Sequence, residues 1–69
     1  MERIAVNSSN LASVGYENNS LTLEVEFLHG GTYQYYGVTE DVYTALMNAD
    51  SVGSFFSRNI RNNYPTQKI

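Results

Sequence analysis

Apolar and polar side chains alternate strictly between residues 21 and 27. The apolar positions are Leu21, Leu23, Val25 and Phe27. A period of two predicts a strand with one buried face and one hydrated face. Gly30 and Gly31 then tolerate positive φ, and residues 32–36 resume as a strand rich in β-forming residues. We therefore expect an antiparallel hairpin in which Tyr33 and Tyr35 face the apolar row.

Two further strands are predicted before this hairpin, a short one at residues 3–6 and a second at residues 11–17. The shared face of the second strand carries Ala12, Val14 and Tyr16. Gly15 lies within this strand, where a glycine favours a bulge or the close approach of another backbone. Turns rich in asparagine and serine separate the strands. The pattern therefore predicts an antiparallel meander of three or four strands.

The spacing of apolar residues changes to that of a helix after Val38. One stripe at helical spacing carries Val42, Ala45, Leu46 and Ala49. We predict a first helix from about Thr39 to Asn48, with Thr39 as its cap. Glu40 and Asp41 in the first turn place negative charge at the positive end of the helix dipole.

A second helix is expected after a tight corner. Its cap is Asp50 or Ser51, and its inner side carries Val52, Phe55, Phe56 and Ile60. The helix should end around Asn62 or Asn63, because Tyr64 precedes a proline and is pushed away from the α region. A connection this short lets both helices close over the same face of the sheet.

The pattern thus predicts one α+β domain spanning residues 1–69. It is an antiparallel meander of three to four strands followed by two C-terminal helices packed on one face. The residues that we expect to be buried together are Leu23, Val25, Phe27, Tyr33, Leu46, Phe56 and Ile60.

The chain of 69 residues has no cysteine and no apolar run long enough for a signal peptide or a membrane span. We expect a cytoplasmic monomer that does not associate with membranes. The formal net charge is -3, but it is distributed unevenly. The stretch 1–50 carries all seven acidic residues and only one basic residue, whereas 51–69 carries Arg58, Arg61 and Lys68. An anionic partner would therefore meet the C-terminal segment first.

Candidate catalytic chemistry is sparse. His29 is the only histidine, and no nucleophile or orienting carboxylate lies near it in the sequence. Glu24 and Glu26 share one strand face and are interpreted as the hydrated side of that strand. We expect no catalytic residue, no metal site and no cofactor.

An aromatic and basic set is the remaining candidate for a site. Arg58 and Arg61 are three residues apart on one helix flank, and Tyr36 and Tyr43 are candidate exposed rings. Such residues bind single-stranded nucleic acid, because bases stack on the rings and cations hold phosphates. The alternative is that the tyrosines belong to the core and the arginines form a hydrated helix face. Three or four cations favour a short single strand over sequence-specific binding of duplex DNA.

Short motifs in a fixed order extend over almost the whole chain. They are Asn7-Ser8-Ser9-Asn10, Val14-Gly15-Tyr16, the run from Leu21 to Phe27 with Gly30 or Gly31 after it, Tyr33-Gln34-Tyr35, Val38, Val42-Tyr43, Ser51-Val52-Gly53, Phe55-Phe56, and Ile60-Arg61 ending at Tyr64. In this order the chain resembles the KTSC domain, a small family named for its place at the C-terminus of some lysyl-tRNA synthetases and also found as a stand-alone bacterial protein. Thr39 is a departure, since many members have proline at that helix start.

The resemblance implies no catalytic residue or cofactor, and attachment to a synthetase implies RNA or tRNA as a partner. The family motif maps to Tyr33, Tyr35, Ser51, Gly53 and Phe56, followed by Arg58 and Arg61. We therefore expect a non-enzymatic binding module for RNA or another single-stranded nucleic acid. The alternative is a protein–protein interaction module that uses an unpaired sheet edge or an aromatic surface.

Overall fold

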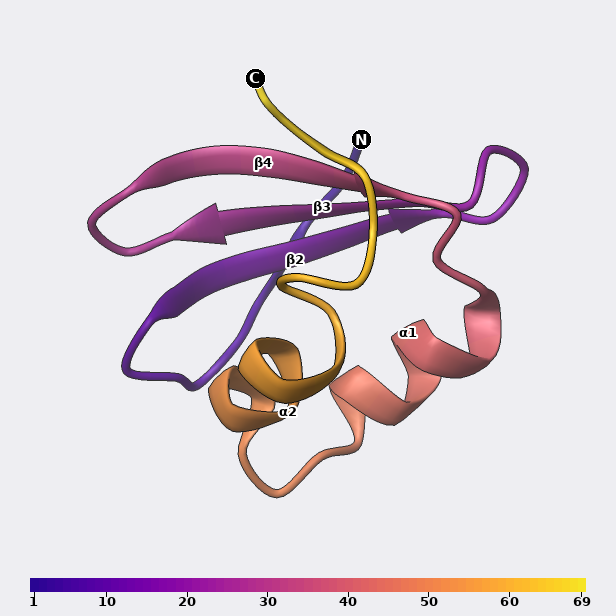
Figure 1. Ribbon diagram of the computed structural model, residues 1–69. Coiled ribbons are helices and arrows are strands. Elements are labelled where there is room, and N and C mark those ends of the chain that lie inside the picture. The colour runs from indigo at the N-terminus through magenta and orange to yellow at the C-terminus, as the bar shows by residue number, and fades with distance from the viewer.

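The computed structural model describes residues 1–69 as one five-stranded antiparallel sheet, in the order β1-β2-β3-β4-β5, with two helices against one face (Figure 1). The elements are β1 (Ile4–Ala5), β2 (Leu11–Glu17), β3 (Thr22–Phe27), β4 (Gly31–Tyr36), α1 (Glu40–Met47), α2 (Val52–Asn59) and β5 (Thr66–Lys68). The predicted α+β class, with an antiparallel meander followed by two helices on one face, is confirmed. Neither helix is long and apolar enough to cross a bilayer.

The central hairpin has the predicted register. Val25 lies opposite Tyr33 and Leu23 lies opposite Tyr35, so both tyrosines share the face of the apolar row. Leu21 is the exception, because it lies outside β3 with φ at 53° and remains 37% exposed. Its carbonyl accepts hydrogen bonds from the backbone N–H groups of Gly37 and Val38, so the chain turns there instead of continuing the strand.

Strand β2 contains a bulge, but at its start rather than at Gly15. The register between β2 and β3 shifts between Leu11 and Ser13, so Leu11, not Ala12, is buried beside Val14. Gly15 makes the close approach that its position suggested. A Cβ there would lie 2.5 Å from the carbonyl oxygen of Glu2, so glycine is required where the N-terminal segment crosses the sheet.

The two helices begin as predicted, and α2 ends early. Thr39 occupies the N-cap of α1 without a side-chain hydrogen bond, whereas the Oγ of Ser51 accepts a hydrogen bond from the N–H of Ser54 at the start of α2. Helix α2 ends at Asn59, before the predicted end at Asn62 or Asn63. The reason is that the N–H groups of Ile60 and Arg61 both bond to the same carbonyl, that of Phe56.

Strand β5 was not predicted. It runs along the outer edge of β4, with Thr66 opposite Tyr35 and Lys68 opposite Tyr33. The N–H of Ile69 also donates to the carbonyl of Thr32. Figure 1 shows the chain rising from α2 past the sheet to reach this edge. The outer strands of the sheet are therefore β1 and β5, of only two and three residues.

The core lies between the sheet and the helices. The buried apolar residues are Leu11, Val14, Leu23, Val25, Tyr35, Val38, Leu46, Phe56 and Ile60. Five of the seven residues predicted to be buried are in this set. Phe27 and Tyr33 instead lie at its margin, partly buried, because the end of the hairpin extends past the cover of α2 and borders a hollow.

Candidate functional site

A hollow of about 500 Å³ lies between the β3–β4 hairpin and α2. We call it the aromatic hollow, and it is lined by Asn10, Leu11, Phe27, His29, Gly30, Tyr33, Tyr35, Gly53, Phe56, Ser57, Arg61, Asn62 and Thr66. Its volume falls within the range of about 300–1,000 Å³ that is typical of small-molecule sites.

Four aromatic rings form the apolar wall of the aromatic hollow. The ring of Phe56, on α2, packs against rings from two neighbouring strands. Its centroid is 5.5 Å from that of Phe27 on β3 and 5.3 Å from that of Tyr35 on β4. Tyr33 packs against Phe27 at 5.6 Å. All three pairs meet edge to face, a favourable arrangement that fixes the ring positions.

The rim of the aromatic hollow is polar. Arg61 and Asn62 follow α2, His29 lies in the hairpin turn, and Asn10 precedes β2. Burial raises the pKa of the Tyr35 hydroxyl above its ordinary value, while the Thr66 hydroxyl and the Arg61 guanidinium act in the opposite direction. The Arg61 side chain thus contributes positive charge to the rim of the aromatic hollow.

A second hollow of about 490 Å³ adjoins the first. We call it the polar hollow because it has no apolar lining residue. Its lining consists of Asn7, Ser8, Ser9, Asn10, Asp50, Ser51, Gly53, Ser54, Ser57 and Arg58. Asn10, Gly53 and Ser57 line both hollows. The two spaces are therefore neighbouring parts of one face.

The loop before β2 packs against the start of α2 and divides the two hollows. The Oγ of Ser8 accepts hydrogen bonds from the N–H groups of Asn10 and Leu11, both at 3.2 Å. A Cβ on Gly53 would lie 2.9 Å from that same oxygen. Ser51 caps α2, and the missing side chain of Gly53 lets the loop pack closely against the helix. Both motif residues therefore fix the position of the backbone that lines the two hollows.

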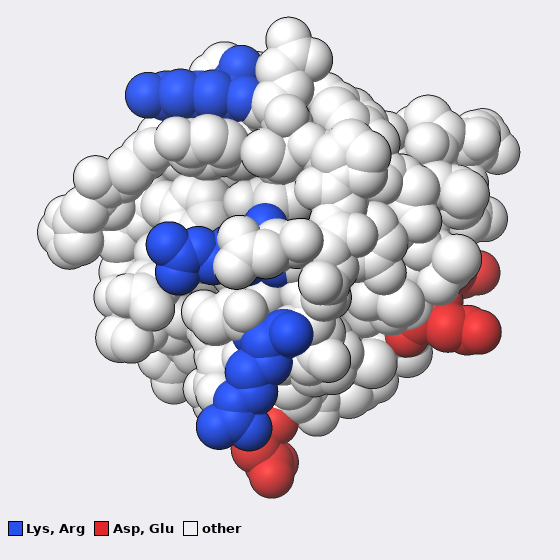
Figure 2. Space-filling model, in the orientation of Figure 1, with Lys and Arg blue, Asp and Glu red and all other residues white.

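The basic residues of this face are not paired with acids. Arg58 and Arg61 form no ion pair, and the side chain of Lys68 on β5 lies beside Gly31 at the hairpin tip. Figure 2 shows basic side chains over the C-terminal part of the chain and α2, with acidic groups at the lower and right-hand margins of the view. The basic residues that are clustered in the C-terminal segment of the sequence therefore also lie on one face of the molecule.

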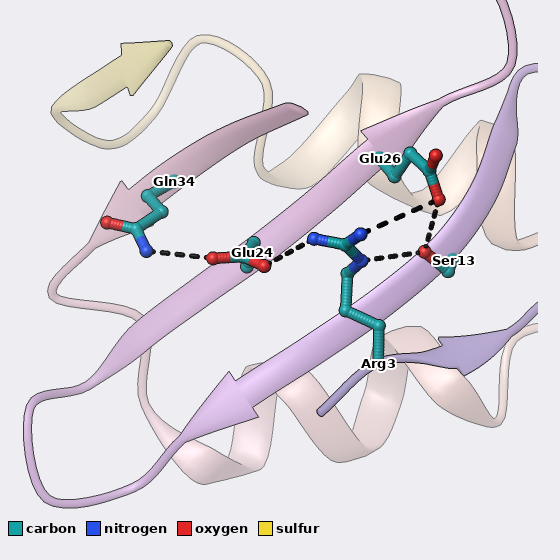
Figure 3. Close-up of polar contacts among 5 residues, drawn as sticks. All are labelled: Arg3, Ser13, Glu24, Glu26 and Gln34. Atoms are coloured by element: carbon teal, nitrogen blue, oxygen red, sulfur yellow. Dashed lines mark hydrogen bonds and ion pairs between the residues drawn. The ribbon is translucent and has the colours of Figure 1, made fainter. Parts of the chain in front are cut away.

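Arg3, the one basic residue that forms ion pairs, lies on the opposite face of the sheet. Arg3 reaches over the sheet from the N-terminal segment and pairs with Glu24 and Glu26, and the Nε2 of Gln34 donates to Glu24 at 2.9 Å (Figure 3). Glu24 is only 5% exposed, so its interpretation as a hydrated residue was wrong. The hydrogen bond from Gln34 holds the pKa of Glu24 below its ordinary value, and Arg3 adds to the effect, although burial opposes it.

The structure separates the predicted tyrosines from the arginines. The hydroxyl of Tyr36 lies 2.9 Å from the Oε1 of Gln34 and 3.2 Å from the Oε1 of Gln67, and its one hydrogen can be donated to either, on the face of the Arg3 network. The ring of Tyr43 stacks on Tyr16 at 4.7 Å. Neither tyrosine lines either hollow. The aromatic side chains that line the same hollow as Arg61 are those of the family motif, Tyr33, Tyr35 and Phe56, together with Phe27.

Two lining residues, Ser57 and Thr66, had no signal in the sequence pattern. They join Asn10, from the motif before β2, and Asn62, beside the two arginines in sequence, only after folding. The side chains of Asn10, Ser57 and Asn62 have no intramolecular hydrogen bond, so their polar groups are available to a ligand. His29 also lines the aromatic hollow, and it is exposed there.

Comparison with known proteins places the chain in a family. The KTSC domain matches residues 7–64, and the chain belongs to that family. A protein of Stutzerimonas stutzeri (strain A1501), described as uncharacterized, is 45% identical over 58 residues, which cover 84% of this chain and 82% of the relative. A protein of Tsukamurella paurometabola is 38% identical over 50 residues, with coverage of 72% and 75%.

A solved structure extends the similarity to the full fold. The crystal structure of a KTSC domain protein from Yersinia pestis matches with a TM-score of 0.97 at 40% sequence identity. The match covers 99% of this chain and 96% of that one, so it includes the strands β1 and β5 outside the family match. The five-stranded sheet is thus shared with an experimentally solved relative.

Proposed function

We propose that this KTSC domain is a non-enzymatic binding module for single-stranded nucleic acid, with RNA as the leading ligand. The observation that carries the proposal is the position of Arg58 and Arg61, two arginines without ion pairs, beside two adjoining hollows of which one is walled by aromatic rings. We further propose that it acts as a monomer in the cytoplasm.

The chemistry of this face supports a single strand. Unpaired bases stack on aromatic side chains and hydrogen-bond through their edges, and phosphates bind to arginine. Rings, free amide groups and guanidinium groups all lie within the two hollows. The net charge of -3 opposes long-range attraction of a polyanion, so affinity should depend on local contacts and should be modest.

Duplex DNA fits this face less well. Each phosphate neutralised on duplex DNA contributes about 0.9 to the magnitude of the slope of log affinity against log salt. Two or three basic side chains can therefore supply only a shallow slope.

The two arginines provide the direct test. Arg58→Ala with Arg61→Ala should weaken binding of a short single-stranded RNA at least about tenfold at low salt and flatten its salt dependence, measured by fluorescence anisotropy. A matched control is Asn18→Asp with Thr44→Glu, which lowers the net charge equally at exposed positions outside both hollows.

The control should lose much less affinity than the arginine variant. Equal losses would mean that only net charge matters, which would contradict a defined site. RNA binding that is undiminished in the arginine variant, or absent in the wild-type protein, would overturn the proposal in favour of a protein ligand. A protein ligand would have to use this face, because the outer strands β1 and β5 offer very short edges.

A further inference from the structure

We infer, resting on the proposed function, that the two hollows divide one nucleotide step between them. The aromatic hollow takes a single unpaired nucleobase, and the polar hollow takes the adjoining backbone phosphate at Arg58. The ligand class is therefore a single strand with at least one base free to leave its stack.

The aromatic hollow matches a base in both shape and chemistry. Phe27 and Tyr33 are only partly buried, so part of each ring remains open beside the hollow. Asn10 and Asn62 carry amide groups without intramolecular hydrogen bonds, and an amide can pair with the edge of a base through both a donor and an acceptor. A purely apolar ligand that covered these groups and Arg61 would displace their water without replacing its hydrogen bonds.

The polar hollow matches a phosphate. The side-chain hydroxyl groups of Ser54 and Ser57 make no intramolecular hydrogen bond, and Arg58 supplies a planar donor group with a permanent charge. Asp50 is the only acidic residue in the lining. Its negative charge repels an anion, so removal of that charge should raise the affinity if an anion binds in this hollow.

The shared lining of the two hollows indicates how one ligand would occupy both. Both are lined by Asn10 and Ser57, so the two hollows are neighbours separated by a shared wall. In a nucleic acid the base and the phosphate are joined through one sugar. A single nucleotide step therefore spans the shared wall, whereas a free anion would need only the polar hollow.

The test compares two probes of equal charge, the RNA tetranucleotide of uridines and an abasic tetranucleotide with the same number of phosphates. The wild-type protein should bind the uridine probe about 5- to 160-fold more tightly, which is the range expected for stacking of one base. Tyr33→Leu should reduce this preference to near unity with little change in salt slope. Tyr36→Leu, a tyrosine on the opposite face, is the matched control and should preserve the preference.

The polar hollow is tested with both probes. Arg58→Gln should weaken binding of both and lower the salt slope by about 0.7. Asp50→Asn should tighten binding of both by up to about fivefold, because it removes a repulsive charge. In the wild-type protein, ring resonances of Phe27 and Tyr33 should shift with the uridine probe and not with the abasic one, which keeps the test independent of variant folding.

The outcomes separate this inference from the proposed function. Equal binding of the two probes with loss in Arg58→Gln would overturn the base site and leave nucleic-acid binding intact. Binding that is indifferent to Asp50→Asn and Arg58→Gln would overturn the phosphate site. Absence of binding by both probes would overturn the proposed function itself.

Discussion

Glu24 shows how a carboxylate is stabilised within a domain of this size. Its oxygens accept hydrogen bonds from Arg3 and Gln34, and Gly15 lets the backbone of the N-terminal segment come close enough for Arg3 to reach it. A carboxylate that is hydrogen-bonded in this way has a lowered pKa, and folding then becomes more favourable as the carboxylate ionises.

Arg3→Met should therefore lower the free energy of unfolding by about 1–3 kcal/mol near neutral pH, because it leaves Glu24 with an incomplete set of partners. Since the folded pKa of Glu24 lies below the unfolded value of about 4.3, the native pairing contributes fully above that pH and is lost as pH falls through the folded pKa. The difference between wild type and variant should shrink accordingly in urea titrations below about pH 4.

Glu2→Gln provides the control for this experiment, because Glu2 is exposed and forms no ion pair. It should change stability by less than about 0.5 kcal/mol. A cost of Arg3→Met that stays constant from pH 3 to pH 7 would contradict the assignment of the effect to Glu24.

Gly53 yields a second prediction about a single position. Alanine is favoured over glycine within a helix by up to about 1 kcal/mol, but here its Cβ would meet the Ser8 oxygen. Gly53→Ala should therefore destabilise the protein by about 1–3 kcal/mol through overpacking. In a Ser8→Ala background the same substitution should be neutral or stabilising, and calorimetric melting of the wild type, the two single variants and the double variant measures this coupling.

The elements differ in how far the sequence predicts them. The hairpin and both helices follow from regular spacing, in which Val25 marks the strand period and Leu46 the helix period. Strand β5 has no such signal, because Thr66, Gln67 and Lys68 are all polar and exposed. Only the β4 edge makes this segment a strand, so it depends on a tertiary contact.

Removal of residues 66–69 tests the contribution of β5. Each lost hydrogen bond to β4 contributes about 0.5–1.5 kcal/mol, so the free energy of unfolding should fall by at least about 1 kcal/mol. The exposed β4 edge should also promote self-association, visible as a larger mass in sedimentation at high concentration. A truncated protein of unchanged stability that remains a monomer would contradict this role.

The two faces of the sheet differ in how their charged residues are paired. One face of the sheet is closed by the Arg3 network, and the other carries the helices and, at their margin, the two hollows with free arginines. The sequence indicated the basic segment and the motif tyrosines. It could not indicate which tyrosines meet the arginines, because Tyr43 is held by Tyr16 and Tyr36 by Gln67, both distant in sequence.

The most direct measurement is an amide chemical-shift titration of the ¹⁵N-labelled protein with short single-stranded RNA at low salt, repeated at higher salt. We predict shifts that cluster at α2, the turn containing Asn62 and the hairpin tip, with none at the Arg3 network, and that fade as salt rises. An unchanged spectrum, or shifts centred on Tyr36 and Gln67, would contradict the assignment of nucleic-acid binding to this face.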